Sequence, residues 1–206
     1  GVVAKDTPGF LVNRIARPFY GEALHLFEEQ MADMATIDWA LTELGGFRMG
    51  PFALMDLIGH DVNYVVTETV WKQFYYDPRF RPSLSQKRLL DAGWLGRKSG
   101  RGFYDYRNGA TLPEPTRDEA LGRAIVDRVV AMLINEAADA VYRGIGSESD
   151  VETAMLKGVN YPKGLIAWGR EWGWTTVRDQ IEALHRRTCD ARYRVCPWIH
   201  DQISAQ

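Results

Sequence analysis

The sequence predicts an all-α fold made of two tandem helical repeats. Apolar residues recur at the i, i+3, i+4 and i+7 spacing along nearly the whole chain, which is typical of amphipathic helices. Stretches rich in glycine and proline separate these periodic segments and predict helix ends. The third observation reveals the repeat, because a shift of 114 residues aligns the two halves without a gap from Asn13 to Gly59.

The composition is that of a globular chain, and 206 residues are enough to bury a core. The formal net charge of −2 gives no reason to expect nucleic acid or an anionic membrane as a partner. Apolar runs are too short to cross a bilayer, and the first residues lack the apolar core of a signal peptide. Cys189 and Cys196 are expected on one helix, too far apart for a disulfide. We therefore expect a cytoplasmic protein with reduced thiols.

Five helices are expected in the first half of the chain. Thr7 and Pro8 form a helix-start signal, because threonine can cap a helix and proline has a preset φ. Gly45 ends the second of these helices, and Pro51 begins the third. The expected helices span residues 10–29, 36–44, 51–58, 61–76 and 83–92.

A linker divides the chain into two domains. Residues 96–102 are rich in glycine and basic residues, and residues 103–106 alternate like a short extended piece. Residues 108–115 contain Asn-Gly and Pro-Glu-Pro, which is typical of a connecting segment. We therefore assign residues 1–107 to a first helical repeat and residues 116–206 to a second, degenerate repeat.

The helical pattern restarts after the linker. Residues 116–119 form a capping box that opens a long helix to Arg143, and residues 149–152 form a second capping box. A last amphipathic helix is expected from Thr176 towards Cys196. The shift of 114 places seven residues on identical ones: Arg14, Glu22, Ala23, Ala40, Gly50, Ala53 and Gly59 on Arg128, Glu136, Ala137, Ala154, Gly164, Ala167 and Gly173. A tandem duplication explains this match.

Three segments in the first half resemble a known family. Residues 5–14 (KDTPGFLVNR), 49–56 (MGPFALMD) and 96–104 (GRKSGRGFY) resemble, in this order, the C-terminal domain of 3-hydroxyacyl-CoA dehydrogenases. Residues 74–80 (FYYDPRF), taken together with residues 93–96 (GWLG), resemble segments of the bacterial two-repeat members assigned to phenylacetate breakdown.

The resemblance implies an enzyme that oxidises (S)-3-hydroxyacyl-CoA to 3-oxoacyl-CoA with NAD, in phenylacetate or fatty-acid breakdown. Its catalytic His and Glu and the NAD fold are expected in an N-terminal Rossmann domain, which is absent here, since residues 96–102 lack the strand–turn–helix context of a dinucleotide fingerprint. The chain alone is therefore expected to be inert. The expected partners are an acyl-CoA substrate, the Rossmann domain and further copies of the same chain.

The resemblance also assigns site residues. Asn13 matches the Asn that the helical domain contributes near the substrate's C3 oxygen, where a carboxamide can donate or accept without changing charge. The matching place in the second repeat is Asp127, so no second catalytic site is expected. Lys98 matches a Lys that reaches towards the cofactor, although a solvated loop Lys is an equal alternative.

Three more residues are candidates for the substrate side. Phe10 is a candidate for the acyl chain, although an ordinary core Phe is the favoured alternative. Met49 and Pro51 are candidates to line the acyl pocket at a helix start, although the repetition of Gly50 as Gly164 favours a structural turn there. Three arginines are candidates to bind a carboxylate at the substrate's far end, and the sequence does not rank them: Arg17, Arg48 and Arg79. No metal site is expected, because the Glu-x-x-His pattern of residues 22–25 is not repeated in the second half.

Two alternatives remain open. The chain can act mainly as an assembly module, in which the second repeat imitates the partner through which one-repeat family members dimerise. It can also be a different helical partner of a Rossmann domain, as in hydroxyisobutyrate or phosphogluconate dehydrogenases, but the ordered segments favour the first family.

Overall fold

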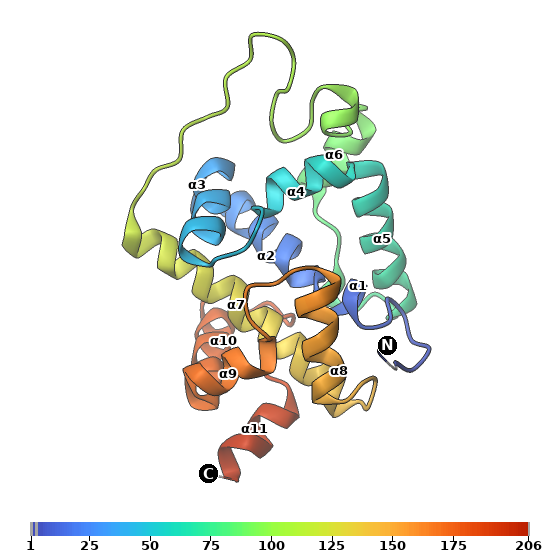
Figure 1. Ribbon diagram of the computed structural model, residues 1–206, viewed down its shortest axis with the longest axis vertical. Helices are drawn as coiled ribbons and strands as arrows, with labels where there is room; N and C mark the ends of the chain where they lie inside the picture. Colours follow the sequence, from blue (N-terminus) through green and yellow to red (C-terminus); the bar gives the residue numbers. More distant parts are fainter. Residues whose placement is uncertain (1, 3, 206) are drawn as a thin grey trace.

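A computed structural model describes residues 2 and 4–205, which form helices joined by loops (Figure 1). This part of the chain has two isolated β-bridges and no sheet, so the all-α prediction is confirmed. None of its helices is long and apolar enough to cross a membrane. The first repeat contains α1 (Val12–Ile15), α2 (Arg17–Glu28), α3 (Met34–Trp39), the π-helical turn η1 (Ala40–Leu44), α4 (Pro51–Ile58), α5 (His60–Gln73), η2 (Pro78–Phe80), α6 (Leu84–Asp91) and η3 (Arg97–Ser99). The second contains α7 (Glu119–Tyr142), α8 (Glu148–Thr153), the π-helical turn η4 (Ala154–Gly158), α9 (Leu165–Trp172), α10 (Trp174–Thr188) and α11 (Pro197–Ser204).

The duplication is visible in the backbone. Helix α4 lies 114 residues before α9, and the π-helical turn η1 lies 114 residues before η4. A π-helical turn is rare, so its occurrence at both places is strong evidence for a common origin. Gly59 and Gly173, which end α4 and α9, also share an unusual backbone, with φ of 98° and 84°.

The helix expected at residues 10–29 differs from the prediction. It begins at Val12 and not at residue 10, and the turn before it holds Phe10 in the left-handed region at φ 48°. It is also interrupted at Ala16 before α2 starts. Pro18 explains the interruption, because a proline cannot donate to the carbonyl of residue i−4. The second repeat has Met132 at this place, and α7 runs unbroken.

Three boundaries in the second repeat also differ. Asp118 caps α7 in place of the predicted Thr116, and the second capping box joins Ser147 to Asp150, two residues earlier than expected. Helix α10 ends at Thr188, because Cys189 adopts a left-handed backbone. The two cysteines therefore lie on separate elements, and both are free thiols.

The two repeats share one hydrophobic core. Helix α7 crosses the middle of the molecule, with α2 packed along one side and α9, α10 and α11 along the other (Figure 1). Equivalent apolar residues of the two repeats are buried in the same cluster, as Ile15 and Phe19 are with Val129 and Leu133. Phe47 and its equivalent Tyr161 contact each other edge to face, with ring centroids 5.1 Å apart. Equivalent residues of the two repeats thus contact each other, as is expected on an approximate twofold axis between them.

Candidate functional site

Buried ion pairs join the repeats across the pseudo-twofold axis. Arg14 Nε donates to Glu136 at 2.9 Å, and its guanidinium also pairs with Asp139. The equivalent residue, Arg128, donates to Glu22 at 2.8 Å. Each repeat therefore supplies the arginine for the other repeat's glutamate, as two subunits do in an isologous dimer.

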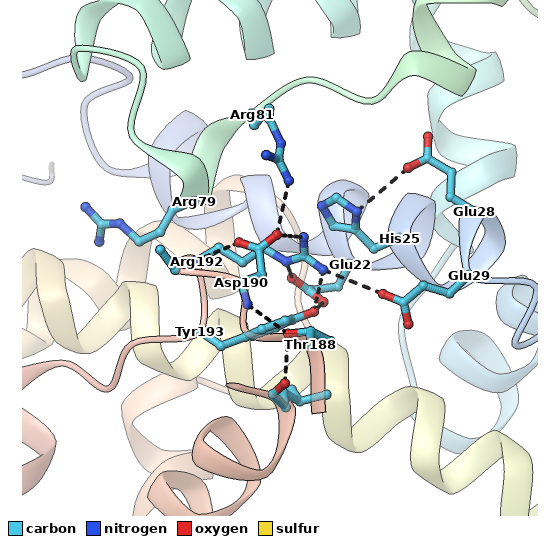
Figure 2. Close-up of polar contacts among 12 residues, drawn as sticks. Glu22, His25, Glu28, Glu29, Arg79, Arg81, Thr188, Asp190, Arg192 and Tyr193 are labelled. Atoms are coloured by element: carbon cyan, nitrogen blue, oxygen red, sulfur yellow. Dashed lines mark hydrogen bonds and ion pairs between the residues drawn. The ribbon is translucent and has the colours of Figure 1, made fainter. Parts of the chain in front are cut away.

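Loop residues of the second repeat surround the side chain of Glu22. Figure 2 shows Glu22 beside Arg192 and Tyr193, with Asp190 between Arg192 and Arg81. Tyr193 donates to Glu22 at 2.7 Å. The carboxylate of Glu22 is thus held by the other repeat, which leaves it unsuited to bind a metal. No group of three His, Cys, Asp or Glu side chains among residues 2 and 4–205 is arranged to hold a metal ion.

An acidic side chain fixes the start of α4. Asp38 accepts the backbone N–H groups of Phe52 and Ala53, both at 2.9 Å. A Cβ at Gly50 would lie 2.3 Å from the Asp38 carboxyl carbon, so only glycine fits there. The second repeat uses the same device, because Glu152 accepts the N–H groups that follow Gly164. This anchor is the physical reason why the glycine occurs in both repeats.

Asp56 holds the glycine-rich closing segment. This buried carboxylate accepts the backbone N–H groups of Phe103 and Tyr104, both at 2.9 Å. A Cβ at Gly96 or Gly102 would collide with Asp56, at 2.2 and 2.1 Å. Residues 96–104 are therefore wrapped around Asp56.

A buried polar chain continues from Asp56 into α6. His60 lies 2.8 Å from Asp56 through Nε2 and 3.3 Å from the Gln86 amide through Nδ1. Gln86 also donates to Asn63 at 2.9 Å. Sequence reasoning missed Asp38, Asp56 and this chain. The repetition of Gly50 was the signal for Asp38, while nothing local in the sequence indicates the partners of Asp56.

Asn13 lies in an open groove between the repeats. It is exposed, and the groove also contains Phe10 and Val12 from the first repeat. The opposite side comes from Ala154, Lys157 and Gly158 in the second. Phe10 is 57% exposed, so the alternative of an ordinary core phenylalanine does not fit its position. The structure therefore brings Asn13 and Phe10 together at a solvent-accessible surface.

The other three candidate residues, Met49, Pro51 and Lys98, lie in different surroundings. Met49 is half-buried and lines a second groove, while Pro51 is buried at the first turn of α4. Lys98 is exposed and pairs with Asp61 near the start of α5. This hydrogen bond from Lys98 holds the pKa of Asp61 below its usual value. Neither groove is lined by Lys98.

The equivalent of Asn13 has different surroundings. Asp127 is half-buried and lies beside Gln180, Leu184 and Arg187 of the second repeat. Burial raises the pKa of its carboxyl. No residue of the first repeat lines this depression, so it is not a copy of the groove that contains Asn13.

Comparisons with known proteins agree with this architecture. Residues 9–106 and 125–206 match the family described as 3-hydroxyacyl-CoA dehydrogenase, C-terminal domain. The 3-hydroxyadipyl-CoA dehydrogenase of Escherichia coli K12 is 35% identical over 96% of this chain and 59% of its own length. The crystal structure of 3-hydroxybutyryl-CoA dehydrogenase from the same species superimposes with a TM-score of 0.90 and 32% identity, over 98% of this chain and 61% of that one.

Other relatives match about half of the chain. The mitochondrial hydroxyacyl-coenzyme A dehydrogenase of Sus scrofa is 38% identical over 52% of this chain and 34% of its own length. The chain spans about three fifths of the length of the relatives that it matches almost throughout, at 59% and 61%. With both halves matched to one domain family, the chain belongs to the 3-hydroxyacyl-CoA dehydrogenase family and consists of its helical C-terminal region.

Proposed function

We propose that this chain is the substrate-side part of an enzyme that oxidises (S)-3-hydroxyacyl-CoA to 3-oxoacyl-CoA with NAD. The observation that carries the proposal is the exposure of Asn13, beside Phe10, in a groove bordered by both repeats. In the reaction the 3-hydroxyl proton goes to a base and a hydride leaves C3 for the nicotinamide. We assign that base and the dinucleotide site to a separate N-terminal domain, because residues 96–104 are wrapped around Asp56.

Asn13 acts on the oxygen at C3 in this proposal. Its amide N–H donates to the C3 oxygen, first as the hydroxyl that loses its proton to the base and then as the developing carbonyl, and it keeps zero charge throughout. Lys98 is proposed to contact the cofactor from the rim of the domain. Its ion pair with Asp61 is exposed, so exchanging that partner for a phosphate costs little. We place the enzyme in the cytoplasm, in the breakdown of phenylacetate or fatty acids.

The test is the change Asn13→Ala in a protein that joins this chain to a cofactor domain of the family. Losing a hydrogen bond to the developing carbonyl lowers kcat/KM for a 3-hydroxyacyl-CoA about 10²-fold. Asp127→Ala is the matched control, because it alters the equivalent residue in the second repeat and leaves turnover unchanged. An unchanged kcat/KM in the Asn13→Ala protein would refute the catalytic role. The chain without a cofactor domain shows no turnover.

A second function, assembly, is favoured by the reciprocal ion pairs between the repeats, in which each repeat's arginine binds the other repeat's glutamate. Arg14 and Arg128 make the contacts that two subunits would make, so we propose that the second repeat takes the place of a second chain. Light scattering tests this proposal. A mass near 23.4 kDa at high concentration supports internal pairing, whereas a stable dimer shows that the chain also assembles through another surface.

A further inference from the structure

An open apolar groove lies at the boundary of the two repeats. Met49, Leu54 and Leu57 line it from the first repeat, and Val159 and Asn160 line it from the second. Leu57 is 50% exposed there. Such a surface favours a ligand with methylene groups, because covering it removes apolar area from water.

The equivalent place in the second repeat is closed. Met49, Leu54 and Leu57 correspond to Lys163, Trp168 and Glu171. Lys163 pairs with Glu171 and lies 5.6 Å from the centre of the Trp168 ring, while Trp168 stacks on Phe47 at 6.0 Å. The same backbone thus carries an open groove in one repeat and a filled one in the other. The opening therefore depends on side chains of the first repeat and is not imposed by the fold.

An exposed arginine, Arg48, lies at this groove. Arg48 lines it, is exposed, and makes no ion pair or hydrogen bond with any of the described residues. Arg79, by contrast, is held by Glu136 and Asp139 at 3.2 and 3.1 Å. Arg17 is buried and donates to Thr67, and burial lowers the pKa of its guanidinium. The structure therefore ranks Arg48 first among the three arginines as a binder of an external anion.

We propose that this groove holds the acyl chain of the substrate and that Arg48 binds a carboxylate at the far end of that chain. An apolar lining beside a free guanidinium complements an alkyl chain with a terminal carboxylate, because arginine donates two parallel hydrogen bonds to such a group. The inference rests on the function proposed above. The second repeat contributes as well. Thr153, Ala154, Lys157 and Gly158 border the groove of Asn13, and the adjoining residues 159–161 border this one. Consecutive residues of the second repeat thus line the two grooves, and we infer that the acyl group passes from one groove to the other.

Two substrates of equal chain length test the proposal. The full enzyme, with its cofactor domain, is assayed on 3-hydroxyadipyl-CoA and on 3-hydroxyhexanoyl-CoA, which differ only in the terminal carboxylate. We expect the wild type to prefer the adipyl substrate. Arg48→Met lowers kcat/KM for that substrate about 10- to 100-fold, chiefly through KM, because one charge-assisted pair is lost. It changes the value for the hexanoyl substrate less than about threefold, and Arg48→Lys retains part of the preference.

Arg117→Met is the matched control, since Arg117 is an exposed arginine near the linker that lies outside the groove. It leaves both substrates unaffected. An equal effect of Arg48→Met on both substrates, or a wild type without preference, would overturn the assignment of Arg48. Absence of turnover of both substrates by the wild type would instead overturn the proposed function.

A second variant tests the groove itself. The triple change Met49→Lys, Leu54→Trp and Leu57→Glu copies the residues that close the second repeat. We expect this protein to keep its helical circular dichroism and to lose more than about tenfold in kcat/KM for both substrates, since the acyl chain is excluded. Full activity on either substrate in the folded triple variant would show that the acyl chain lies elsewhere.

Discussion

Helix α4 of the first repeat and helix α9 of the second begin alike and meet different surroundings. Each follows a glycine whose place is fixed by a carboxylate, Asp38 or Glu152. Along α4, Asp56 then faces inwards and holds the closing segment. At the equivalent position of α9, Arg170 faces solvent and pairs with Glu148.

The same contrast recurs one turn later. His60 of the first repeat is part of a buried polar chain, whereas its equivalent Trp174 packs over Gly169, whose added Cβ would lie 2.4 Å from the indole ring. After duplication, the contacts that join the repeats were retained in both copies. The buried chain from Asp56 through His60 has no copy in the second repeat, where Arg170 and Trp174 take these places. This difference identifies which features serve the fold and which serve the proposed site.

The largest expected effect concerns the contacts that both repeats share. Arg128→Met leaves Glu22 and Glu29 without their main cation, at a site where the arginine is almost fully buried. Breaking a buried pair by removing one partner costs about 3–5 kcal/mol. Urea denaturation measures this loss.

A double-mutant cycle sharpens the result. Adding Glu22→Gln to Arg128→Met restores part of the lost stability, because the uncompensated charge is then removed. Additive losses in the cycle would show that the two residues are not coupled across the repeats.

The second prediction compares the loss of stability when equivalent residues of the two repeats are replaced. Asp56→Ala removes the acceptor of the Phe103 and Tyr104 backbone N–H groups and of the Tyr106 hydroxyl, so we expect a loss of about 3 kcal/mol. Hydrogen exchange accelerates in residues 96–106, which this carboxylate holds. Arg170→Ala, the equivalent change in the second repeat, costs less than about 1 kcal/mol because its ion pair is exposed. Similar losses for both variants would contradict the asymmetry.

Sequence reasoning predicted the elements whose signals are local. Pro51 after Gly50 marked the start of α4, and Ser83 marked the start of α6. The prediction of helix boundaries was wrong where two sequence signals for a boundary disagree. Thr116 resembled a helix cap, but Asp118 takes that role, and Pro18 divided a helix that the apolar pattern joined.

The site was predictable only in part. Asn13 and Phe10 lie together in one groove, but Lys98 lies outside it. The carboxylates that shape the first repeat bind backbone groups far along the chain, since Asp38 reaches residue 52 and Asp56 reaches residue 103. Such pairs are specified by tertiary packing and leave no local pattern. The three arginines could not be ranked for the same reason, because their partners lie in other elements.

The smallest expected effect is a pH dependence at Asp38, the carboxylate that anchors α4 in the first repeat. Burial raises the pKa of Asp38 to about 6, against hydrogen bonds from Phe52, Ala53 and Tyr104 that favour the ionised form. An acid whose pKa is raised on folding binds its proton more tightly in the native state. Its contribution to stability is therefore present below the unfolded value of 3.8 and is lost as the pH rises towards about 6.

The measurement is urea denaturation of the wild type and Asp38→Asn at several pH values between about 4 and 6.5. The stability of the wild type relative to the variant falls by about 2 kcal/mol over this window, because asparagine does not titrate. The comparison uses the slope of the unfolding free energy against pH, so the pH-independent loss of stability caused by replacing a carboxylate oxygen with an amide group cancels. Glu152→Gln, at the equivalent anchor without a tyrosine partner, is the control for the general acid response of the fold. A relative stability that stays flat or rises with pH would show that the helix N-terminus, and not burial, controls the charge of Asp38.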